Sequence, residues 1–357
     1  MIVNKFIICS IVGARPQFIK LAAVCRALEE HNDIHHIIVH SGQHYDHGLS
    51  GQFFLELGIP QPDYNLGIGS QSHNAQIASC ILKIDEVFNI ENPDLVIVYG
   101  DTNTTAAAAI AAAKRNIKLA HIEAGLREFE KSIPEEVNKL ITDSVTDLYF
   151  TPTETGKMNL KDEGKVENVF VTGDISLDLL YKPKFTSILQ RLDLESGAYF
   201  FMTCHRAANT DNVENLSEII SAINRIEEKV VFAIHPRTSS ALEKNHFEIT
   251  NPQVVIINDL GFWDTQTLIK NAKFVITDSG GIIKEAYFHK VPAVIIDTQT
   301  EWVETVEEGW NTVAGPNKIK ILDAIINWQK PDRHCNCLSN GNAGRIIVTE
   351  ILKYLNV

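Results

Sequence analysis

The feature that most constrains the fold of this chain is a repeated alternation of short apolar runs with amphipathic segments. In the first half, the patterns predict strands at 5–12, 35–40, 94–99, 117–122 and 147–151. The stretches between them predict helices at 17–30, 73–88, 104–115 and 135–146. Near-continuous apolar strands that alternate with helices are typical of a parallel sheet covered on both faces.

The same alternation restarts in the second half of the chain. A short strand is expected at 169–172, followed by Gly173-Asp174 and a helical stretch to about residue 181. Further strands are expected at 199–203, 230–234, 254–257, 274–277 and 293–296. A chain of 357 residues also exceeds what one hydrophobic core usually supports. We therefore predict an α/β fold with two Rossmann-like, doubly wound domains facing a central cleft. The predicted boundaries are 1–172 and 173–341, with a C-terminal helix in 342–357 packing back on the first domain.

Composition excludes several classes of function. The net charge of −13 argues against a nucleic-acid binder, although backbone donors and one or two cations suffice for a phosphate ligand. No run approaches about 18 consecutive apolar residues, and the N-terminus lacks a signal-peptide pattern, so we predict a cytoplasmic protein without membrane association. The sequence His334-Cys335-Asn336-Cys337 matches no standard zinc spacing, so a surface loop is expected there and no metal.

Four motifs follow strands of the first predicted domain, where ligands of open parallel sheets bind. Gly13-Ala14-Arg15-Pro16 opens a helix that carries Lys20, and its N-terminus could hold an anion, although an ordinary turn with a surface arginine fits equally well. Three carboxylates follow the later strands: Asp101, Glu123 and Glu135. Each could simply cap a helix or serve its dipole. If they converge, repulsion and burial would tune them for acid/base chemistry.

The second domain offers complementary groups. His205 and His235 each follow a strand, where each could titrate near neutral pH or be a structural residue. Thr277-Asp278-Ser279-Gly280-Gly281 ends a strand and opens a helix, which is the arrangement of a phosphate cradle. Glu285 lies one turn into that helix, where a carboxylate could accept hydrogen bonds from a ribose diol.

Taken in order, these motifs resemble the non-hydrolysing UDP-N-acetylglucosamine 2-epimerase family over almost the whole chain. The resemblance also includes Ser41-Gly42-Gln43-His44, Pro134-Glu135-Glu136-Val137-Asn138 and Thr300-Glu301-Trp302-Val303-Glu304. It implies a glycosyltransferase-B type architecture, a homodimer, a UDP-sugar substrate, and neither metal nor nicotinamide cofactor. Enzymes of this family expel UDP to leave a 2-acetamidoglucal, then return UDP and reprotonate the opposite face.

The resemblance also implies residue roles. It assigns acid/base chemistry to Asp101, Glu123, Glu135 and His205. It assigns contacts with the UDP-sugar to a larger group: Arg15, Lys20, His235, Ser279, Gly280, Gly281 and Glu285.

The chain departs from the common family pattern at several positions. Ala207-Ala208 stands where an arginine and a glutamate help to form a second, regulatory substrate site in many bacterial members. Lys139, Asp297 and Trp302 occupy positions that are often arginine. Trp302-Val303-Glu304 is more like the branch that epimerises UDP-2,3-diacetamido uronic acids, precursors of surface polysaccharides. The substrate is therefore left open between UDP-N-acetylglucosamine and such a uronic acid.

Three other functions share part of this pattern. A glycosyltransferase of the same architecture would share the nucleotide-binding features but would not need the first-domain carboxylates. A hydrolysing 2-epimerase usually begins with Gly-Thr-Arg-Ala-Asp, which this chain lacks. A catalytically inactive sugar-nucleotide sensor is suggested by the substitutions.

Overall fold

A computed structural model of the protein describes residues 6–42, 53–335 and 337–356. Of the residues named above, Lys5, Gln43, His44 and Asn336 lie outside the described ranges. The described chain divides into two compact units, Met1–Lys182 with Cys337–Val357, and Pro183–Asn336. Among the described residues, no helix is both long and apolar enough to cross a membrane.

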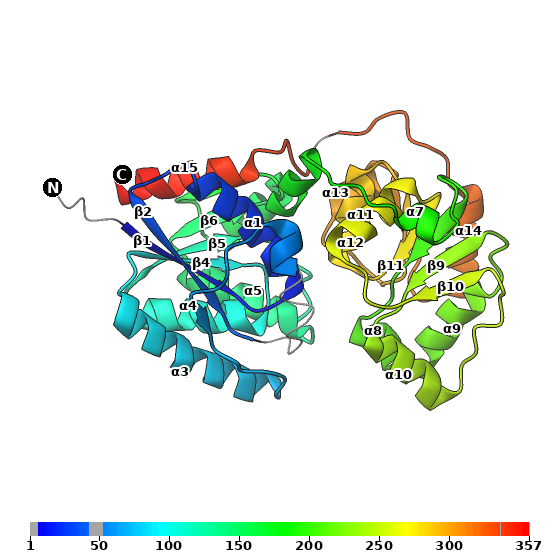
Figure 1. Ribbon diagram of the computed structural model, residues 1–357, viewed down its shortest axis with the longest axis horizontal. Coiled ribbons are helices and arrows are strands. Elements are labelled where there is room, and N and C mark those ends of the chain that lie inside the picture. Colours follow the sequence, from blue (N-terminus) through cyan, green and yellow to red (C-terminus); the bar gives the residue numbers. More distant parts are fainter. Residues whose placement is uncertain (1–5, 43–52, 336, 357) are drawn as a thin grey trace. The chain divides into compact units, whose positions relative to one another are not determined.

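The first unit is built on a parallel sheet of seven strands in the order β3-β2-β1-β4-β5-β6-β7 (Figure 1). The strands are β1 (Phe6–Val12), β2 (Ile34–His40), β3 (Tyr64–Asn65), β4 (Leu95–Tyr99), β5 (Lys118–Ile122), β6 (Leu148–Thr151) and β7 (Val169–Val171). The helices are α1 (Arg15–Leu28), α3 (His73–Glu91), α4 (Asn103–Lys114), α5 (Pro134–Val145), α6 (Glu154–Asp162), the 3-10 helix η1 (Ile175–Tyr181) and α15 (Ala343–Leu355).

The second unit repeats this plan with six parallel strands in the order β10-β9-β8-β11-β12-β13. Its strands are β8 (Tyr199–Met202), β9 (Lys229–Ala233), β10 (Val254–Ile257), β11 (Phe274–Thr277), β12 (Ala293–Ile295) and β13 (Asn311–Val313). Its helices are α7 (Ile188–Arg191), α8 (Ala207–Thr210), α9 (Val213–Ile223), α10 (Pro236–Asn245), α11 (Phe262–Asn271), α12 (Gly280–Phe288), α13 (Val303–Glu307) and α14 (Lys318–Asn327). The predicted α/β class with two Rossmann-like sheets is confirmed.

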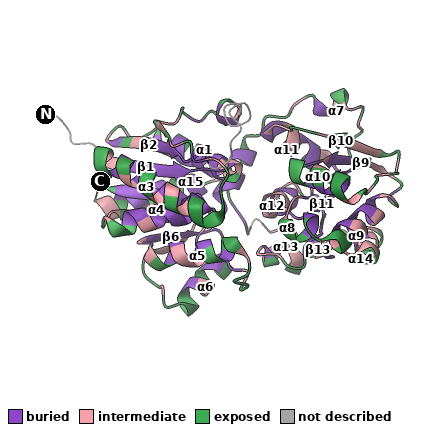
Figure 2. Ribbon diagram, turned by 90° about the horizontal axis from the view of Figure 1, so that it is seen from below, coloured by how far each residue is buried: buried purple, intermediate pink, exposed green. Residues whose placement is uncertain are grey.

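Burial follows the apolar runs of the sequence. The central strands of both sheets are buried, and the helices expose their outer faces (Figure 2). The alanine-rich helix α4 is almost wholly buried between the sheet and its neighbours α3 and α5, because alanine lets backbones approach closely. Helix α15 packs on α1 at a similarly close contact: a Cβ on Gly344 would lie 3.0 Å from the carbonyl oxygen of Ala23.

The predicted boundary after residue 172 differs from the structural division, which falls after Lys182. The predicted second boundary, after residue 341, also differs, since the first unit resumes at Cys337. The physical reason is a set of contacts between 173–182 and the returning chain. The N–H of Asp174 donates to Leu338 O at 2.5 Å, and the hydroxyl of Tyr181 donates to Ser339 O at 2.7 Å. Helix η1 also packs on α1 and therefore belongs to the first unit.

Candidate active site

Both sheets reverse their strand order at one point, between β1 and β4 in the first unit and between β8 and β11 in the second. In open α/β sheets, ligands bind beyond the carboxyl ends of the strands at such a point. The turn that begins at Gly13 follows β1, and Gly100-Asp101 follows β4. His205 comes shortly after β8, and Ser279 after β11. The candidate residues therefore gather at the ligand-binding edge of each sheet.

Gln17 joins the two turns at the switch point of the first sheet. Its side-chain oxygen accepts from the N–H groups of Gly13 and Ala14 at 2.7 and 3.0 Å. Its amide nitrogen donates to Tyr99 O at 2.7 Å and to the hydroxyl of Thr105 at 2.9 Å. Sequence reasoning gave Gln17 no role, although glutamine at the third helical position is a recognised partner of the N-cap backbone.

Lys20 and Glu123 form a close ion pair beside the turn after β4. Their side chains are 7% and 12% exposed. Gly100 adopts φ +60°, and a Cβ on it would lie 3.0 Å from Lys20 Nζ and 3.1 Å from Glu123 Oε2. Glycine at this position thus leaves room for the ion pair. The sequence suggested that Lys20 could reach a bound anion. In the structure its ammonium group pairs with the carboxylate of Glu123.

Asp101 is held by two residues of α5. The side-chain amide of Asn138 donates to Asp101 O at 2.9 Å, and Lys139 Nζ lies 3.7 Å from the Asp101 carboxylate. Lys139 also lies 3.4 Å from the carboxylate of Glu128, a buried group that sequence reasoning missed. An opposite charge nearby favours the ionised carboxylate. The expected mutual repulsion among the site carboxylates is therefore offset by a lysine beside Asp101 and another beside Glu123.

Two adjacent acids at the start of α5 have different environments. Glu136 is buried, and its carboxylate accepts from the backbone N–H groups of Glu128 and Phe129 at 2.8 and 3.3 Å. Glu135 is exposed. It lies three and four residues before Asn138 and Lys139, on the helix face that contacts Asp101. The structure therefore leaves Glu135, and not Glu136, available for a ligand.

In the second unit, Asp278 organises the loop that carries His205. Its carboxylate accepts from the backbone N–H of His205 at 3.0 Å, the N–H of Arg206 at 2.9 Å and the side-chain amide of Asn209 at 3.0 Å. The imidazole Nδ1 lies 3.8 Å from Asp278. Desolvation lowers the pKa of His205, and the opposing effect of Asp278 does not restore it. The lowered pKa favours the neutral imidazole, which can accept a proton. Asp278 lies in the motif Thr277-Asp278-Ser279-Gly280-Gly281, but sequence reasoning assigned it no role.

His235 caps α10. Its Nδ1 accepts from the backbone N–H of Arg237 at 3.1 Å, and the ring centroids of His235 and His205 lie 5.7 Å apart. The capping contact supports the structural reading of His235, while its neighbourhood keeps it close to the candidate site.

The Ser279-Gly280-Gly281 turn opens α12 directly after β11. A Cβ on Gly280 would lie 3.4 Å from Trp302 Nε1 and 3.5 Å from a Glu301 oxygen. Trp302 is buried, with Lys284 Nζ 4.7 Å from the centroid of its ring system. Its indole nitrogen has no hydrogen-bond partner among the described residues. The backbone N–H groups at the helix start remain suited to phosphate oxygens.

The remaining predicted contact residues lie near these elements. Arg15 begins α1, with its guanidinium carbon 5.1 Å from the centroid of the Phe53 ring. Glu285 is buried on α12, one turn after Gly281. Arg206 forms an ion pair with Asp297 at 2.8 Å, so the departure from arginine at 297 gives Arg206 a partner.

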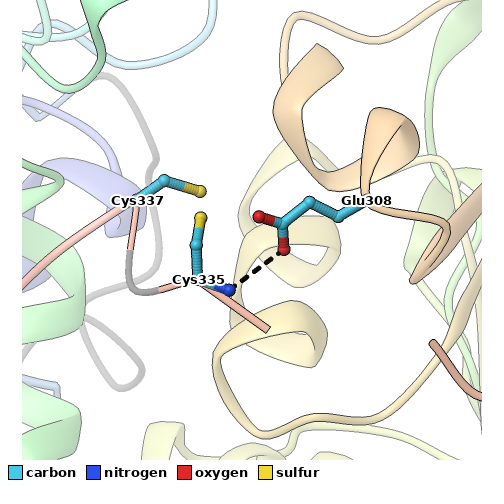
Figure 3. Close-up of side chains that lie close together, drawn as sticks. All are labelled: Glu308, Cys335 and Cys337. Atoms are coloured by element: carbon cyan, nitrogen blue, oxygen red, sulfur yellow. Dashed lines mark hydrogen bonds between the residues drawn. The ribbon is translucent and has the colours of Figure 1, made fainter. Parts of the chain in front are cut away.

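The segment with Cys335 and Cys337 passes from the second unit to the first, and the absence of a metal there stays a prediction from the sequence. In the second unit, the N–H of Cys335 donates to Glu308 at 3.2 Å (Figure 3). Cys337, also drawn there, belongs to the first unit.

Comparison with known proteins identifies a family for this arrangement. A family model described as UDP-N-acetylglucosamine 2-epimerase matches residues 26–352. A protein of Methanococcus maripaludis named as a UDP-N-acetylglucosamine 2-epimerase homolog is 46% identical over 358 residues, which cover 98% of this chain and 99% of that protein. The UDP-2,3-diacetamido-2,3-dideoxy-D-glucuronate 2-epimerase of Pseudomonas aeruginosa is 40% identical over 325 residues, covering 89% of this chain and 90% of that protein.

A solved structure agrees with the sequence comparisons. The UDP-GlcNAc 2-epimerase of Methanocaldococcus jannaschii, in complex with UDP-GlcNAc and UDP, superposes with a TM-score of 0.91 at 39% identity. The match covers 98% of this chain and all of that one.

Proposed function

The chain belongs to the UDP-N-acetylglucosamine 2-epimerase family, and we propose that it inverts C2 of a UDP-2-acetamido sugar by eliminating and re-adding UDP. The observation that carries this proposal is the pair of lysine-held carboxylates, Asp101 and Glu123, at the ligand-binding edge of the first sheet. A glycosyltransferase would not need these two carboxylates. The match of the family model to residues 26–352 supports the same activity.

The proposed epimerisation needs side chains that remove and return the C2 proton and groups that bind the diphosphate while it leaves and re-adds. An ionised carboxylate removes the C2 proton, the C–H electron pair becomes the C1–C2 double bond, and the C1–O bond to the β-phosphate breaks. UDP leaves with that oxygen and its electrons. UDP then re-adds to C1, and a second group delivers a proton to the opposite face of C2. Because the C2 proton is weakly acidic, positioned acid/base groups are needed, and such groups typically contribute about 10²–10⁴-fold.

The proposed acid/base groups are Asp101, Glu123, Glu135 and His205. The ionised form favoured by neighbouring lysines suits a base, which supports this role for Asp101 and Glu123. Glu135 is exposed, so a ligand can reach its carboxylate. The pKa of His205 is lowered, which favours the neutral imidazole that can accept a proton.

The proposed contacts with UDP centre on the start of α12. The backbone N–H groups of Gly280 and Gly281, with the hydroxyl of Ser279, lie at the positive end of the helix and would stabilise the charge that develops on the departing diphosphate. The backbone N–H of Ser279 is not part of this set, because it donates to the hydroxyl of Thr277 at 2.9 Å. Glu285, one turn later, would accept from the ribose hydroxyls. Arg15, Lys20 and His235 complete the proposed set.

Incubation with UDP-N-acetylglucosamine in deuterated water, followed by NMR of the sugar, tests the proposal. The expected result is deuterium at C2 and a second epimer, both still attached to UDP. Stoichiometric free sugar and UDP as final products would refute it and favour the hydrolysing class.

A second substrate, a UDP-2,3-diacetamido uronic acid, is favoured by a specific observation. The Pseudomonas aeruginosa relative named for that substrate is 40% identical over 325 residues, and Trp302-Val303-Glu304 resembles that branch. The same exchange assay with that sugar distinguishes the two: the true substrate should give the higher kcat/KM.

We further propose that the enzyme is a cytoplasmic homodimer supplying precursors for polysaccharide synthesis. Light scattering at micromolar concentration tests the dimer, for which the expected mass is twice the 39.8 kDa of one chain. Cell fractionation tests the location, and a change in surface polysaccharide on deleting the gene tests the pathway.

A further inference from the structure

A buried chain of charges lies directly behind the two catalytic turns of the first unit. His121 lies near the carboxyl end of β5, Asp143 lies on α5, and Arg127 lies in the loop between them. The side chains of His121 and Asp143 are 0% exposed, and that of Arg127 is 1% exposed. Isolated charges at such depth are costly unless they are paired and hydrogen-bonded.

Each side chain in this network has a hydrogen-bonding partner within it. His121 Nδ1 lies 2.6 Å from Asp143 Oδ1, and Arg127 lies 2.7 Å from Asp143 Oδ2. The guanidinium of Arg127 also donates to both oxygens of Glu163, at 2.7 and 2.9 Å. Burial raises the pKa of Asp143, but His121 and Arg127 outweigh it and hold that pKa below its ordinary value, so the carboxyl is ionised.

Both ring nitrogens of His121 face hydrogen-bond acceptors. Its Nε2 lies 2.8 Å from Gly100 O, and a carbonyl oxygen can only accept. Its Nδ1 faces the ionised Asp143, which also accepts. The imidazole thus bridges the backbone of Gly100 and the carboxylate of Asp143.

This network touches both turns that carry proposed acid/base groups. Through Gly100 O, His121 fixes the residue directly before Asp101. Asp143 Oδ2 accepts from the N–H of Gly125 at 3.1 Å, two residues after Glu123. Glu123 itself adopts φ +76°, a conformation that non-glycine residues rarely hold unless their surroundings impose it.

We propose that His121, Asp143 and Arg127 are positioning residues that hold the backbone of Asp101 and Glu123 at a fixed spacing for proton transfer at C2. The proposal rests on the proposed function, because it assumes that these two carboxylates act on the substrate. The three residues themselves touch backbone and each other, not the reacting atoms.

Two substitutions at His121 separate its two contacts. His121→Asn keeps a donor near the position of Nδ1, toward Asp143, and loses the bond to Gly100. His121→Gln keeps a donor near the position of Nε2 and loses the pair with Asp143. A displacement of about 1 Å can cost on the order of 10²-fold in rate, so each variant should lower kcat by about 10- to 10²-fold. KM and the Kd for UDP should stay within about threefold, because the proposed UDP cradle lies on α12 of the other unit.

A second, partly buried histidine of the same sheet provides the matched control. His36 lies on β2, where burial lowers its pKa to about 4, and its Nε2 contacts the hydroxyl of Ser10 at 2.8 Å. His36→Asn should lower the melting temperature and leave kcat per folded molecule within about threefold. A purely structural role for His121 would give the same pattern as His36→Asn, and that result would overturn the proposal.

Substitutions at Arg127 test the network should the His121 variants fail to fold. Arg127→Gln removes the charge facing Asp143 and should lower kcat at least about tenfold at unchanged KM. Arg127→Lys restores a cation there and should recover most of kcat; equal activity in the two variants would contradict the proposal. An inactive wild type would refute the proposed function itself, whereas an active wild type with unaffected variants would refute the positioning role alone.

Discussion

Replacement of Gly100 by alanine tests the site geometry most directly. Gly100 adopts φ +60°, which costs a residue with a Cβ about 1–2 kcal/mol. The added methyl would also lie 3.0 Å from Lys20 Nζ and 3.1 Å from Glu123 Oε2, closer than ordinary van der Waals contact. The Lys20–Glu123 pair must therefore move by a few tenths of an ångström.

The displacement should appear mainly in kcat. Since misplacement by about 1 Å can cost on the order of 10²-fold, a shift of a few tenths should lower kcat by roughly tenfold. The backbone strain of about 1–2 kcal/mol should lower the melting temperature by roughly 2–8 °C for a unit of this size. The Kd for UDP should change less than kcat, because Lys20 is displaced but the proposed contacts on α12 are not perturbed.

Gly164→Ala is the matched control. Gly164 lies in the same unit at φ +81°, and a Cβ there would meet nothing within 4 Å. This variant should lose similar stability and keep wild-type kcat. The assay is C2 exchange in deuterated water with both variants at equal folded concentration, well below their melting temperatures. If the kcat of Gly100→Ala stays within twofold of that of Gly164→Ala, the ion pair does not depend on this turn and the reasoning fails.

Four other predictions concern catalysis, UDP binding, regulation and pH. Three neutral replacements of first-unit carboxylates should each lower kcat by about 10²-fold or more while UDP binding survives. They are Asp101→Asn, Glu123→Gln and Glu135→Gln. Near wild-type turnover in two of them would contradict the assignment. Glu285→Ala should instead weaken UDP binding measured by calorimetry, and an unchanged Kd would remove its proposed ribose contact. Because Ala207 and Ala208 are two exposed alanines where relatives carry a charged pair, substrate saturation should be hyperbolic; a Hill coefficient above one that is abolished by changing Gln43 would show that activation persists. Asp143 has a depressed pKa in the fold, so its stabilisation is present above the unfolded pKa of about 4 and is lost as pH falls through the folded value. The urea midpoint should thus drop between pH 5 and pH 3, and an equally steep drop in Asp143→Asn would exclude this origin.

Much of the fold was predictable because its signals are local. The strand predicted at 254–257 has the same bounds as β10, and the strand predicted at 94–99 starts one residue before β4. The short strands β3 and β13 were missed, since they consist of two and three residues defined by pairing with β2 and β12. The helical stretch before residue 181 proved to be the 3-10 helix η1, whose place in the first unit depends on contacts with 338–339.

The sequence by itself determined which turns carry the candidate chemistry, because apolar runs locate strands and motifs follow their carboxyl ends. It could not determine how charges separated along the chain would pair. Lys20 meets Glu123 across 103 positions, and His121 meets Asp143 across 22. Nor could it distinguish the buried Glu136 from the exposed Glu135, since both suit the first turn of a helix. Those outcomes depend on which side chains the packed sheet and helices bring within hydrogen-bonding distance, and only the tertiary structure decides that.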